Sequence, residues 1–511
     1  MTVDPPRSFG TNRHWPYRGG SFDAFLASRP EEAAIPQPGP DELVARVEAV
    51  SICSSDIKVV RMGSDHPLFR EGAVDTVLGH EVALRVHAVG AAQRGRFRPG
   101  QRLGLQPAMR VGGARRIIGM DLPGGFAQFI VLGPEALADY VFDVPESLSA
   151  AAVALLEPYG CVERAWRINA RTALRPGGRA LIAMASDGEV FTLGQGPGWS
   201  AVEVLGGPAP AFAPQADPVT AVTGPYDDIL ALGDHDAATL GRLAEALAPG
   251  GLLLQGRRAP SPGPVALDPA RIHYDALSFL GTTETALETA FRPRFDARPG
   301  GVALVHGAGG AMGRIHVHRL IGLAEGPRTI LASSRKGRRL ADLEADFAPL
   351  AAARGKRLVV VDTAALPDAV ARHAPGGLDD AVVVAPDPQA IATAAGWLAT
   401  DGLLNVFAGF PFGQGIPLDL ARVARGLRLT GSTGCSVEDM QGVMARVLAG
   451  ELDLAANIKA VAGLDALPAA LEAVAGGAVS GKIVIYPGRP EASLQPVKDR
   501  WGRRDERAML R

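Results

Sequence analysis

The sequence predicts an α/β chain in which a β-rich amino-terminal part precedes parallel sheets covered by helices. Three observations predict it. Apolar and polar residues alternate in short runs over roughly the first 150 residues, as they do in half-buried strands. From Gly178 onward, short apolar strands alternate with alanine-rich helical stretches, which is typical of a parallel sheet with helices on both faces. The later part of the chain also repeats itself.

The β-rich part contains three clear strand patterns. The run ELVARVEAV at 42–50 alternates apolar and polar residues, and 81–89 and 126–132 repeat this pattern between glycine and proline turns. After Ser149 the pattern changes, because SAAAVALLEPYGCVERAWRINARTAL has the spacing of a helix. We therefore expect the sheet-forming part to end near this point.

The repeat consists of two stretches with the same order of strands and helices. Asp227 and Asp379 open equivalent strands and lie 152 residues apart, and Gly281 and Gly431 in the last strands lie 150 residues apart. Each copy follows Pro-Gly-Gly and an apolar strand. We interpret the copies as tandem Rossmann-like units, of which the first is shorter and lacks closely spaced glycines. The alternative is that two α/β segments merely look alike.

The second copy begins with a glycine turn. In VALVHGAGGAMGRIHVHRLI, an apolar strand leads into the turn and then into a helical pattern. Backbone N–H groups of a turn without Cβ atoms can face a pyrophosphate, while the helix N-terminus supplies partial positive charge. This context predicts a dinucleotide site formed by Gly307, Gly309, Gly310, Met312 and Gly313. The alternative is a tight turn that binds no ligand.

The residues after the following strand indicate which dinucleotide binds. An acid about 20 positions beyond the glycines would accept hydrogen bonds from the ribose of NAD(H). This stretch holds no acid and instead contains Ser333, Ser334, Arg335 and Lys336. Since a guanidinium suits a 2′-phosphate, we expect NADP(H) in preference to NAD(H). The basic pair at 338–339 is expected to be solvated in at least one position.

These patterns divide the chain into four parts. The expected parts are a β-rich catalytic unit at 1–170 that is completed by about 437–490, an inserted degenerate Rossmann-like unit at 171–298, an NADP(H)-binding Rossmann unit at 299–436, and a tail at 491–511. The charged tail either docks on a neighbouring subunit or is loose, and the sequence leaves both open.

Composition and charge exclude several classes of partner. Of the 511 residues, 47% are hydrophobic and 21% are charged, which suits large buried cores. A net charge of -2 gives no long-range attraction to nucleic acid or anionic lipid. The three cysteines lie far apart, so no disulfide scaffold is expected, and no signal peptide or membrane span is recognisable. We expect a cytoplasmic protein with a small-molecule substrate, no nucleic-acid partner and no membrane.

Three short motifs of the amino-terminal part carry metal-ligand residue types. They are SICSSD with Cys53, LGHE with His80 and Glu81, and LLEP with Glu157. A thiolate, an imidazole and a carboxylate suit a catalytic zinc that keeps one position open for water or substrate. Taken singly, each residue has an ordinary alternative: a packed thiol, a core histidine or a helix cap.

The order and spacing of these motifs resemble the zinc-dependent branch of the medium-chain alcohol and polyol dehydrogenases. The resemblance implies a GroES-like catalytic domain and makes Cys53, His80 and Glu157 the ligands of one catalytic zinc. It also implies that Glu81 either ligates in some states or supports the ligands. Because residues 95–125 contain no cysteine, the second, structural zinc of this family is expected to be absent.

Two further roles follow from the resemblance. Ser55 stands where the family places a hydroxyl that takes the substrate proton, and Asp56 stands where a carboxylate orients the ligand histidine. Ser54 replaces the usual glycine of the family motif, which leaves the ligands unchanged. Cys161 and Cys435 match no ligand position, and we expect them to be packing residues.

The residues around these motifs resemble the L-sorbose-1-phosphate reductase branch of this family. The stretches SDIKVVRMGSDHP, PGGFAQFIVLGPEAL, EPYGCVE and GAGGAMGRIHVHR carry this likeness, which covers 40–170 and 299–487 and not the first repeat copy. The likeness implies a sugar or polyol phosphate as substrate, and a non-phosphorylated polyol, sugar or aminocyclitol is the alternative. We also expect a homodimer or homotetramer. Lys58, with Arg61 and His66, is then a candidate for contacts to substrate hydroxyl or phosphate groups, and surface charge is the alternative.

Together the patterns predict an enzyme that transfers a hydride between NADP(H), or NAD(H), and a secondary alcohol or ketone. A second hypothesis keeps the fold without the metal, as in zinc-free NADPH quinone or enoyl reductases. A third is a catalytically inactive nucleotide-binding scaffold. Metal analysis distinguishes the first two, and turnover with a panel of polyols distinguishes both from the third.

Overall fold

The described residues of the computed structural model are 10–66, 75–112, 114–167, 171–186, 188–194, 196–292, 294, 296–335 and 337–510. The chain folds into two compact units. The first combines Met1–Cys161 with Gly434–Arg511, and the second is Val162–Thr433. Within the described ranges, no helix combines the length and the apolar character that a bilayer crossing requires.

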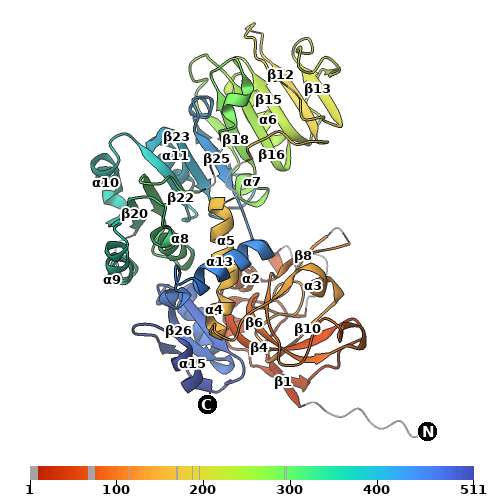
Figure 1. Ribbon diagram of the computed structural model, residues 1–511, viewed down its shortest axis with the longest axis vertical. Helices are drawn as coiled ribbons and strands as arrows, with labels where there is room; N and C mark the ends of the chain where they lie inside the picture. The colour runs from red at the N-terminus through yellow and green to blue at the C-terminus, as the bar shows by residue number, and fades with distance from the viewer. Residues whose placement is uncertain are drawn as a thin grey trace, which may run out of the picture. The chain divides into compact units, whose positions relative to one another are not determined.

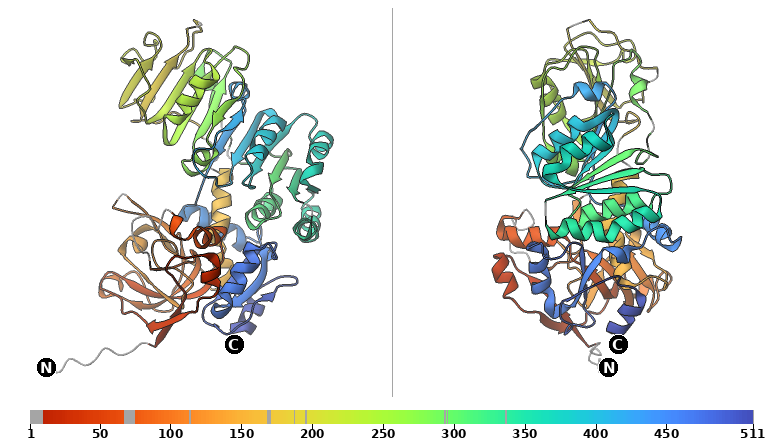
Figure 2. Two further views of the ribbon diagram at one scale, coloured as in Figure 1. Left: turned by 180° about the vertical axis from the view of Figure 1, so that it is seen from behind. Right: turned by 90° about the vertical axis from the view of Figure 1, so that its left-hand side faces the viewer.

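The largest sheet of the first unit brings the two ends of the chain together. Its strands follow the order β11-β7-β6-β4-β27-β26-β28, and β10 pairs with β4. The C-terminal strand β27 is antiparallel to β4, with Val484 opposite Ser51. Figure 2 accordingly shows blue C-terminal elements of this unit beside its red and orange amino-terminal elements.

The elements of the first unit are short. Its strands are β1 Thr11–His14, β2 Pro16–Tyr17, β3 Glu31–Ala34, β4 Leu43–Ser51, β5 Thr76–Val77, β6 Glu81–Val89, β7 Arg102–Leu105, β8 Ala108–Val111, β9 Ala114–Ile117, β10 Phe129–Leu132, β11 Val141–Asp143, β26 Ile458–Gly463, β27 Lys482–Tyr486 and β28 Gln495–Pro496. Its helices are α1 Phe22–Leu26, α2 Ser54–Met62, α3 Pro134–Asp139, α4 Ala150–Ala154, α13 Val437–Leu448, α14 Leu467–Ala475 and α15 Arg503–Leu510, and α5 Leu156–Arg167 continues into the second unit.

The predicted strands are present, but the predicted helix after Ser149 is broken. β6 has the predicted bounds, β4 is shifted by one residue, and β10 is shorter than predicted because only its last four residues pair with β4. The helix ends at Ala154 and resumes at Leu156. Pro158 explains the break, because it has no N–H to donate to the carbonyl of Ala154 four residues earlier.

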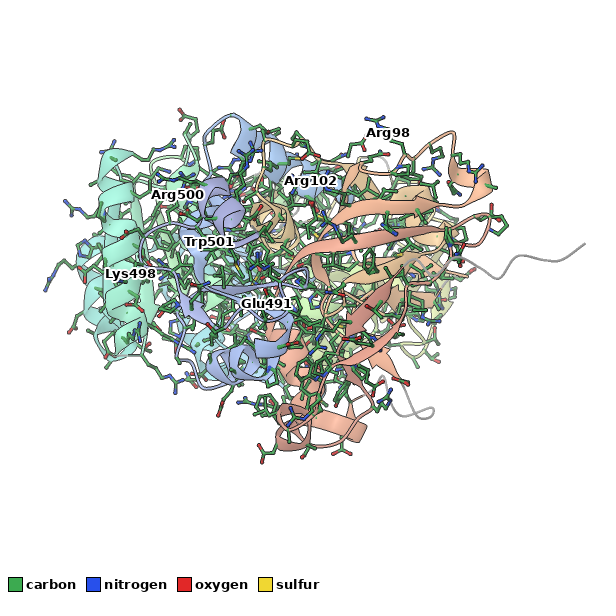
Figure 3. The ribbon with its side chains drawn as sticks, turned by 90° about the horizontal axis from the view of Figure 1, so that it is seen from below. Arg98, Arg102, Glu491, Lys498, Arg500 and Trp501 are labelled. Atoms are coloured by element: carbon green, nitrogen blue, oxygen red, sulfur yellow. The ribbon has the colours of Figure 1, made fainter. Side chains whose placement is uncertain are left out.

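The C-terminal tail docks on the first unit itself. Glu506 of α15 is buried, and its carboxylate accepts hydrogen bonds from the backbone N–H groups of Ala150 (2.8 Å) and Ala151 (3.0 Å). These are orphan donors at the start of α4, where a negative charge also suits the helix dipole. The Tyr486 hydroxyl donates to Glu506 (3.0 Å) and accepts from the indole N–H of Trp501 (2.6 Å), which Figure 3 labels on the tail. The tail is therefore bound within its own chain.

The second unit is built on one long sheet. Its strands follow the order β14-β13-β12-β15-β16-β18-β25-β23-β22-β19-β20-β21, and Figure 1 shows this succession from β13 and β12 through β18 and β25 to β22 and β20. Every neighbouring pair in the sheet is parallel except β18 with β25, which is antiparallel. The sheet thus consists of two parallel halves joined at their edges.

The two halves correspond to the two copies of the sequence repeat. The first half contains β12 Arg179–Met184, β13 Ala201–Leu205, β14 Asp217–Val219, β15 Tyr226–Leu232, α6 Ala237–Glu245, β16 Leu247–Gly256, β17 Val265–Leu267, α7 Pro269–Tyr274 and β18 Ser278–Thr282. The second contains β19 Val302–His306, α8 Ala311–Gly322, β20 Thr329–Ser334, α9 Arg338–Ala353, β21 Arg357–Asp362, α10 Leu366–His373, β22 Leu378–Val383, α11 Pro388–Trp397, β23 Leu398–Val406, β24 Ile416–Leu418, α12 Ala421–Ala424 and β25 Arg428–Gly431.

Candidate functional site

The first cluster of candidate residues surrounds the start of helix α2. Strand β4 ends at Ser51, and α2 begins at Ser54. The carboxylate of Asp56 accepts a hydrogen bond from the backbone N–H of Cys53 (2.9 Å), which fixes the first turn of the helix. Cys53 and Ser55 are half-buried, whereas Asp56 is fully buried.

His80 completes this cluster from the turn before β6. Gly79 has a φ of +94°, a backbone conformation that favours glycine, and it brings the histidine toward α2. The His80 Nδ1 atom lies 3.4 Å from the Asp56 carboxylate, and its Nε2 atom lies 3.3 Å from the Ser55 hydroxyl. Burial alone would lower the pKa of His80, but the negative charges of Asp56 and Cys53 raise it well above its ordinary value.

The donor atoms fit a zinc ion. The sulfur of Cys53, a ring nitrogen of His80 and a carboxylate oxygen of Glu81 all lie within 4.8 Å of one another. Asp56 faces Nδ1 of His80, so Nε2 can present its lone pair to a cation. A thiolate and an imidazole beside a carboxylate are donors that zinc accepts.

Lys482 holds Glu81 in place, and the sequence alone did not reveal it. Its ammonium lies 2.5 and 2.7 Å from the two carboxylate oxygens of Glu81, and both side chains are buried. Burial opposes the charge of Lys482, but Glu81 outweighs it and raises the pKa of the lysine. A lysine opening the apolar strand KIVIY was the available signal. This ion pair engages both oxygens of Glu81, so a cation at this group would share the carboxylate with the ammonium of Lys482.

Glu157 lies in a neighbouring cluster. Its carboxylate accepts a hydrogen bond from the thiol of Cys161 (3.3 Å), and the donor atoms of Glu157, Cys161 and Cys435 lie within 4.8 Å of one another. Burial raises the pKa of Glu157, with His80 opposing that shift. Hydrogen bonding to Cys435, burial and the charge of Glu157 raise the pKa of Cys161 well above its ordinary value. The groups of Cys53 and of Glu157 therefore lie near each other, although no single group contains both.

The basic candidates that follow Cys53 differ in their surroundings. Lys58 is exposed on α2. Arg61 lies over the ring of Phe22, 5.5 Å from its centroid, and donates to the carbonyl of Ala475 (3.2 Å). The backbone N–H of His66 bonds to the carbonyl of Gly63. Arg61 therefore contacts other parts of the first unit, and both Lys58 and Arg61 are exposed.

The second unit holds the glycine turn between β19 and α8. Gly307 has a φ of +94°, and a Cβ there would lie 2.7 Å from the backbone nitrogen of Ala385. A Cβ on Gly313 would lie 2.3 Å from the carbonyl oxygen of Gly307, so only glycine lets α8 pack onto the turn. A Cβ on Gly310, by contrast, would meet only the Gly307 oxygen at 4.0 Å. Half-buried Met312 lies in the first turn of α8.

The start of α8 has the features of an anion site. Its N-cap is Gly310, and no described side chain caps it. Backbone N–H groups at such a helix start lack internal acceptors, and the helix dipole adds partial positive charge. The open space at Gly310 would let a ligand approach this backbone.

The residues that follow β20 lie against the glycine turn. Ser334 is half-buried, and a Cβ on Gly309 would lie 2.4 Å from its hydroxyl. Arg335 is exposed, whereas Ser333 is fully buried and shares a hydrogen bond with Nδ1 of His306 (2.9 Å). Lys336 lies outside the described residues. Of the later basic pair, Arg338 is 79% exposed beside Asp342, as predicted for a solvated position, and Arg339 lies against Gly309.

Comparison with known proteins shows which proteins this fold and these motifs resemble. Residues 39–146 match the family described as "Alcohol dehydrogenase GroES-like domain". The first unit carries this domain, and parts of the chain are similar to alcohol dehydrogenases and to an L-sorbose 1-phosphate reductase, which confirms the predicted resemblance.

Individual relatives match a limited part of the chain. A probable alcohol dehydrogenase AdhA of Mycobacterium tuberculosis is 30% identical over 32% of this chain and 53% of its own length. An L-sorbose 1-phosphate reductase of Klebsiella pneumoniae is 30% identical over 28% of this chain and 35% of its own length. An L-threonine 3-dehydrogenase of Stenotrophomonas maltophilia is 27% identical over 25% of this chain and 40% of its own length. The chain spans about half or less of the length of these curated relatives.

Solved structures extend the likeness to both units at the level of fold. A putative zinc-binding dehydrogenase from Sinorhizobium meliloti bound to NADP has a TM-score of 0.53 and 18% identity, covering 94% of this chain and 100% of that chain. A 2R,3R-butanediol dehydrogenase from Bacillus subtilis has a TM-score of 0.55 and 15% identity, covering 93% and 99%. The predicted fold class, a GroES-like domain with Rossmann parallel sheets, is confirmed.

Proposed function

We propose that this chain catalyses hydride transfer between NADP(H) and a secondary alcohol or ketone of a polyol, sugar or sugar phosphate. The observation that carries the proposal is the convergence of the Cys53 sulfur, the His80 imidazole and the Ser55 hydroxyl on one side of α2. These are a metal-ligand pair and a proton carrier within one cluster. A nucleotide-type glycine turn in the same chain supplies the other half of the chemistry.

In this proposal Cys53 and His80 hold one catalytic zinc together with Glu157, and Glu81 supports them. When bound, zinc acts as a Lewis acid on the substrate oxygen. Asp56 fixes the ring of His80, and the charge of Lys482 holds Glu81. Half-buried Ser55 lies beside His80 and would relay the substrate proton: its oxygen accepts the hydroxyl proton during alcohol oxidation while its own proton passes to solvent, and the reverse transfer serves ketone reduction.

The dinucleotide would bind at the glycine turn, with its pyrophosphate at the start of α8. Exposed Arg335 favours the 2′-phosphate of NADP(H) over the ribose hydroxyl of NAD(H). The variant Arg335→Ala should raise the KM for NADP(H) by about tenfold, as loss of one charge-assisted contact predicts, and leave the KM for NAD(H) nearly unchanged. Equal changes in the two values would contradict the assignment.

The substrate class rests on the named relatives. The sorbose phosphate reductase, the threonine dehydrogenase and the butanediol dehydrogenase are each named for a substrate that carries its reacting group beside other polar groups. Exposed Lys58 is a candidate for contact with a substrate hydroxyl or phosphate. For this chain we propose a small-molecule substrate of that kind, turned over by a cytoplasmic homodimer or homotetramer.

The decisive experiment is a substrate screen with the purified full chain, using NADP(H) and NAD(H), with and without a chelator. We expect chelator-sensitive turnover of at least one polyol or sugar phosphate, and its loss in Cys53→Ser and His80→Asn. Turnover of quinones or enoyl thioesters that survives the chelator would support the zinc-free alternative. Absence of any turnover together with normal NADP(H) binding would support the inactive scaffold.

A further inference from the structure

The cluster of Glu157, Cys161 and Cys435 has no role in the proposed reaction beyond Glu157. We propose that these three residues form a second zinc-binding position, with two thiolates and one carboxylate as donors. The donor atoms lie within 4.8 Å of one another and come from two segments far apart in sequence. This inference goes beyond the single catalytic zinc of the proposed function and replaces the expectation that both cysteines only pack.

Helix α5 supplies two of the donors with fixed spacing. Glu157 and Cys161 are four residues apart, so their side chains lie on the same face of the helix. Their donor atoms already meet, since the Cys161 thiol donates to the Glu157 carboxylate at 3.3 Å. A carboxylate and a thiol one helical turn apart can hold one cation without rearrangement of the backbone.

Cys435 is held in place by contacts that do not involve its sulfur. Its carbonyl accepts a hydrogen bond from the buried side-chain amide of Gln106 (2.8 Å). The next residue, Ser436, caps α13 reciprocally with Asp439, which fixes the chain at this point. The third donor is therefore preorganised before any ion binds.

Gly160 is what allows the two segments to approach. A Cβ at this position would lie 3.2 Å from the Cβ and 3.3 Å from the sulfur of Cys435, and 3.0 Å from the side chain of Met440. At these distances the side chains of Cys435 and Met440 would have to move away from an added Cβ. The motif Glu-Pro-Tyr-Gly-Cys thus places both donors of α5 on either side of the residue that admits Cys435.

The donor chemistry indicates the ion. Two cysteine sulfurs select a soft or borderline cation, and a set of two thiolates, one carboxylate and one open position suits zinc. Cys435 and Glu157 are buried and Cys161 is half-buried, so the three donors lie mostly out of contact with solvent. Glu157 has two carboxylate oxygens, so the same residue can serve this position and the catalytic one.

The test is the zinc content of the full chain after reconstitution with zinc and removal of excess metal. We expect two equivalents in the wild type, and one in both Cys161→Ser/Cys435→Ser and the matched control Cys53→Ser. If the wild type holds one equivalent that only the double variant removes, the proposed second position is supported and the proposed catalytic zinc is wrong. If the double variant keeps the wild-type content, the second position is wrong.

A measurement with cobalt tests the same position without the double variant, which could fail to fold. In Cys53→Ser protein, Co²⁺ should show near-ultraviolet thiolate charge-transfer absorption, because two cysteine sulfurs remain. Gly160→Ala removes no donor, and we expect it to weaken zinc binding at this position by about tenfold through displacement of Cys435. Absence of thiolate absorption in folded Cys53→Ser protein would overturn the proposal.

Discussion

The two halves of the long sheet share a fold but differ at the point where a nucleotide could bind. In each half, a buried aspartate bonds to an arginine side chain and to a backbone N–H group. In the first half Asp228 pairs with Arg171 (2.7 Å) and accepts from the backbone N–H of Arg175 (2.8 Å). In the second, Asp380 pairs with Arg294 (2.5 Å) and accepts from the backbone N–H of Arg298 (2.8 Å). These contacts are equivalent, so the halves are two copies of one structure.

The difference lies between the first two strands of each half. In the second, α8 follows the glycine turn and lies between β19 and β20. In the first, the described residues between β12 and β13 form no helix, and Phe191 and Leu193 are buried in the apolar core there. Without a helix start, the described residues between β12 and β13 offer an anion no helix dipole. The first half therefore forms the same kind of parallel sheet without the helix start that makes the second half a candidate nucleotide site.

The two halves pair with each other as if related by an internal two-fold axis. Strands β17 and β24 pair antiparallel, with Ala266 opposite Pro417, and these two residues are themselves equivalent in the repeat, 151 residues apart. β18 and β25 pair in the same way, with Ser278 opposite Thr430 and Phe279 opposite Leu429. Self-complementary pairing of this kind characterises an interface between two identical subunits. Here one chain supplies both sides, so the edge of β25 is already occupied.

The largest expected effect concerns what the halves share. Asp228→Asn and Asp380→Asn each remove a fully buried carboxylate from a half-buried arginine and a backbone N–H, and we expect each to destabilise the second unit by about 3–5 kcal/mol. Burial raises the pKa of Asp380 to about 6, so the measurement belongs at about pH 8, where the carboxyl is ionised. Thermal unfolding of both variants checks this. A large drop for one variant and none for the other would refute the equivalence of the networks.

The next effect separates the halves. Gly310→Ala adds a methyl group where the protein leaves space but where the pyrophosphate would approach. We expect the Kd for NADP(H) to rise about 100-fold, which corresponds to about 2.7 kcal/mol, with an unchanged melting temperature. Gly376→Ala, also in open space but far along the sequence from the turn, is the matched control and should bind normally. An unchanged Kd for NADP(H) in Gly310→Ala would show that the glycine turn is not the binding site.

How far the sequence predicted these features depends on whether the signal was local. The glycine turn, the strand alternation and the order of Cys53, His80 and Glu157 are local patterns, and they sufficed for the fold class and for the candidate residues. The ion pair of Lys482 with Glu81 joins residues 401 apart. The approach of Cys435 to Cys161 likewise depends on how distant segments pack, so a pattern of neighbouring residues could not predict either contact.

A third prediction uses α8, which only the second half possesses. His316 on this helix is fully buried, and its Nδ1 atom accepts a hydrogen bond from the indole N–H of Trp166 (3.0 Å). Burial, aided by the charge of Arg319, lowers the pKa of His316 to about 3. The unfolded chain takes up the proton near pH 6.5 and the folded chain does not, so stability is full above that pH and falls below it.

The expected loss from this histidine is about 2 kcal/mol at pH 5. His316→Phe retains the bulk but cannot take up a proton. We expect it to unfold at a lower temperature than the wild type at neutral pH, and to lose less stability between pH 7 and pH 5. Melting curves across this range measure the difference. Parallel pH profiles for the two proteins would show that His316 is not the group responsible.

The smallest expected effect tests whether the halves really pair within one chain. Ala266 and Pro417 face each other across the antiparallel pair, so cysteines at both positions should form a disulfide on mild oxidation. If the pairing is internal, Ala266→Cys/Pro417→Cys migrates as a single chain without reductant, and its melting temperature changes little. If the halves were exchanged between two chains, the same bond would produce a covalent dimer. Ala266→Cys alone controls for links through the native cysteines, and a covalent dimer seen only in the double variant would replace the internal two-fold with a swapped one.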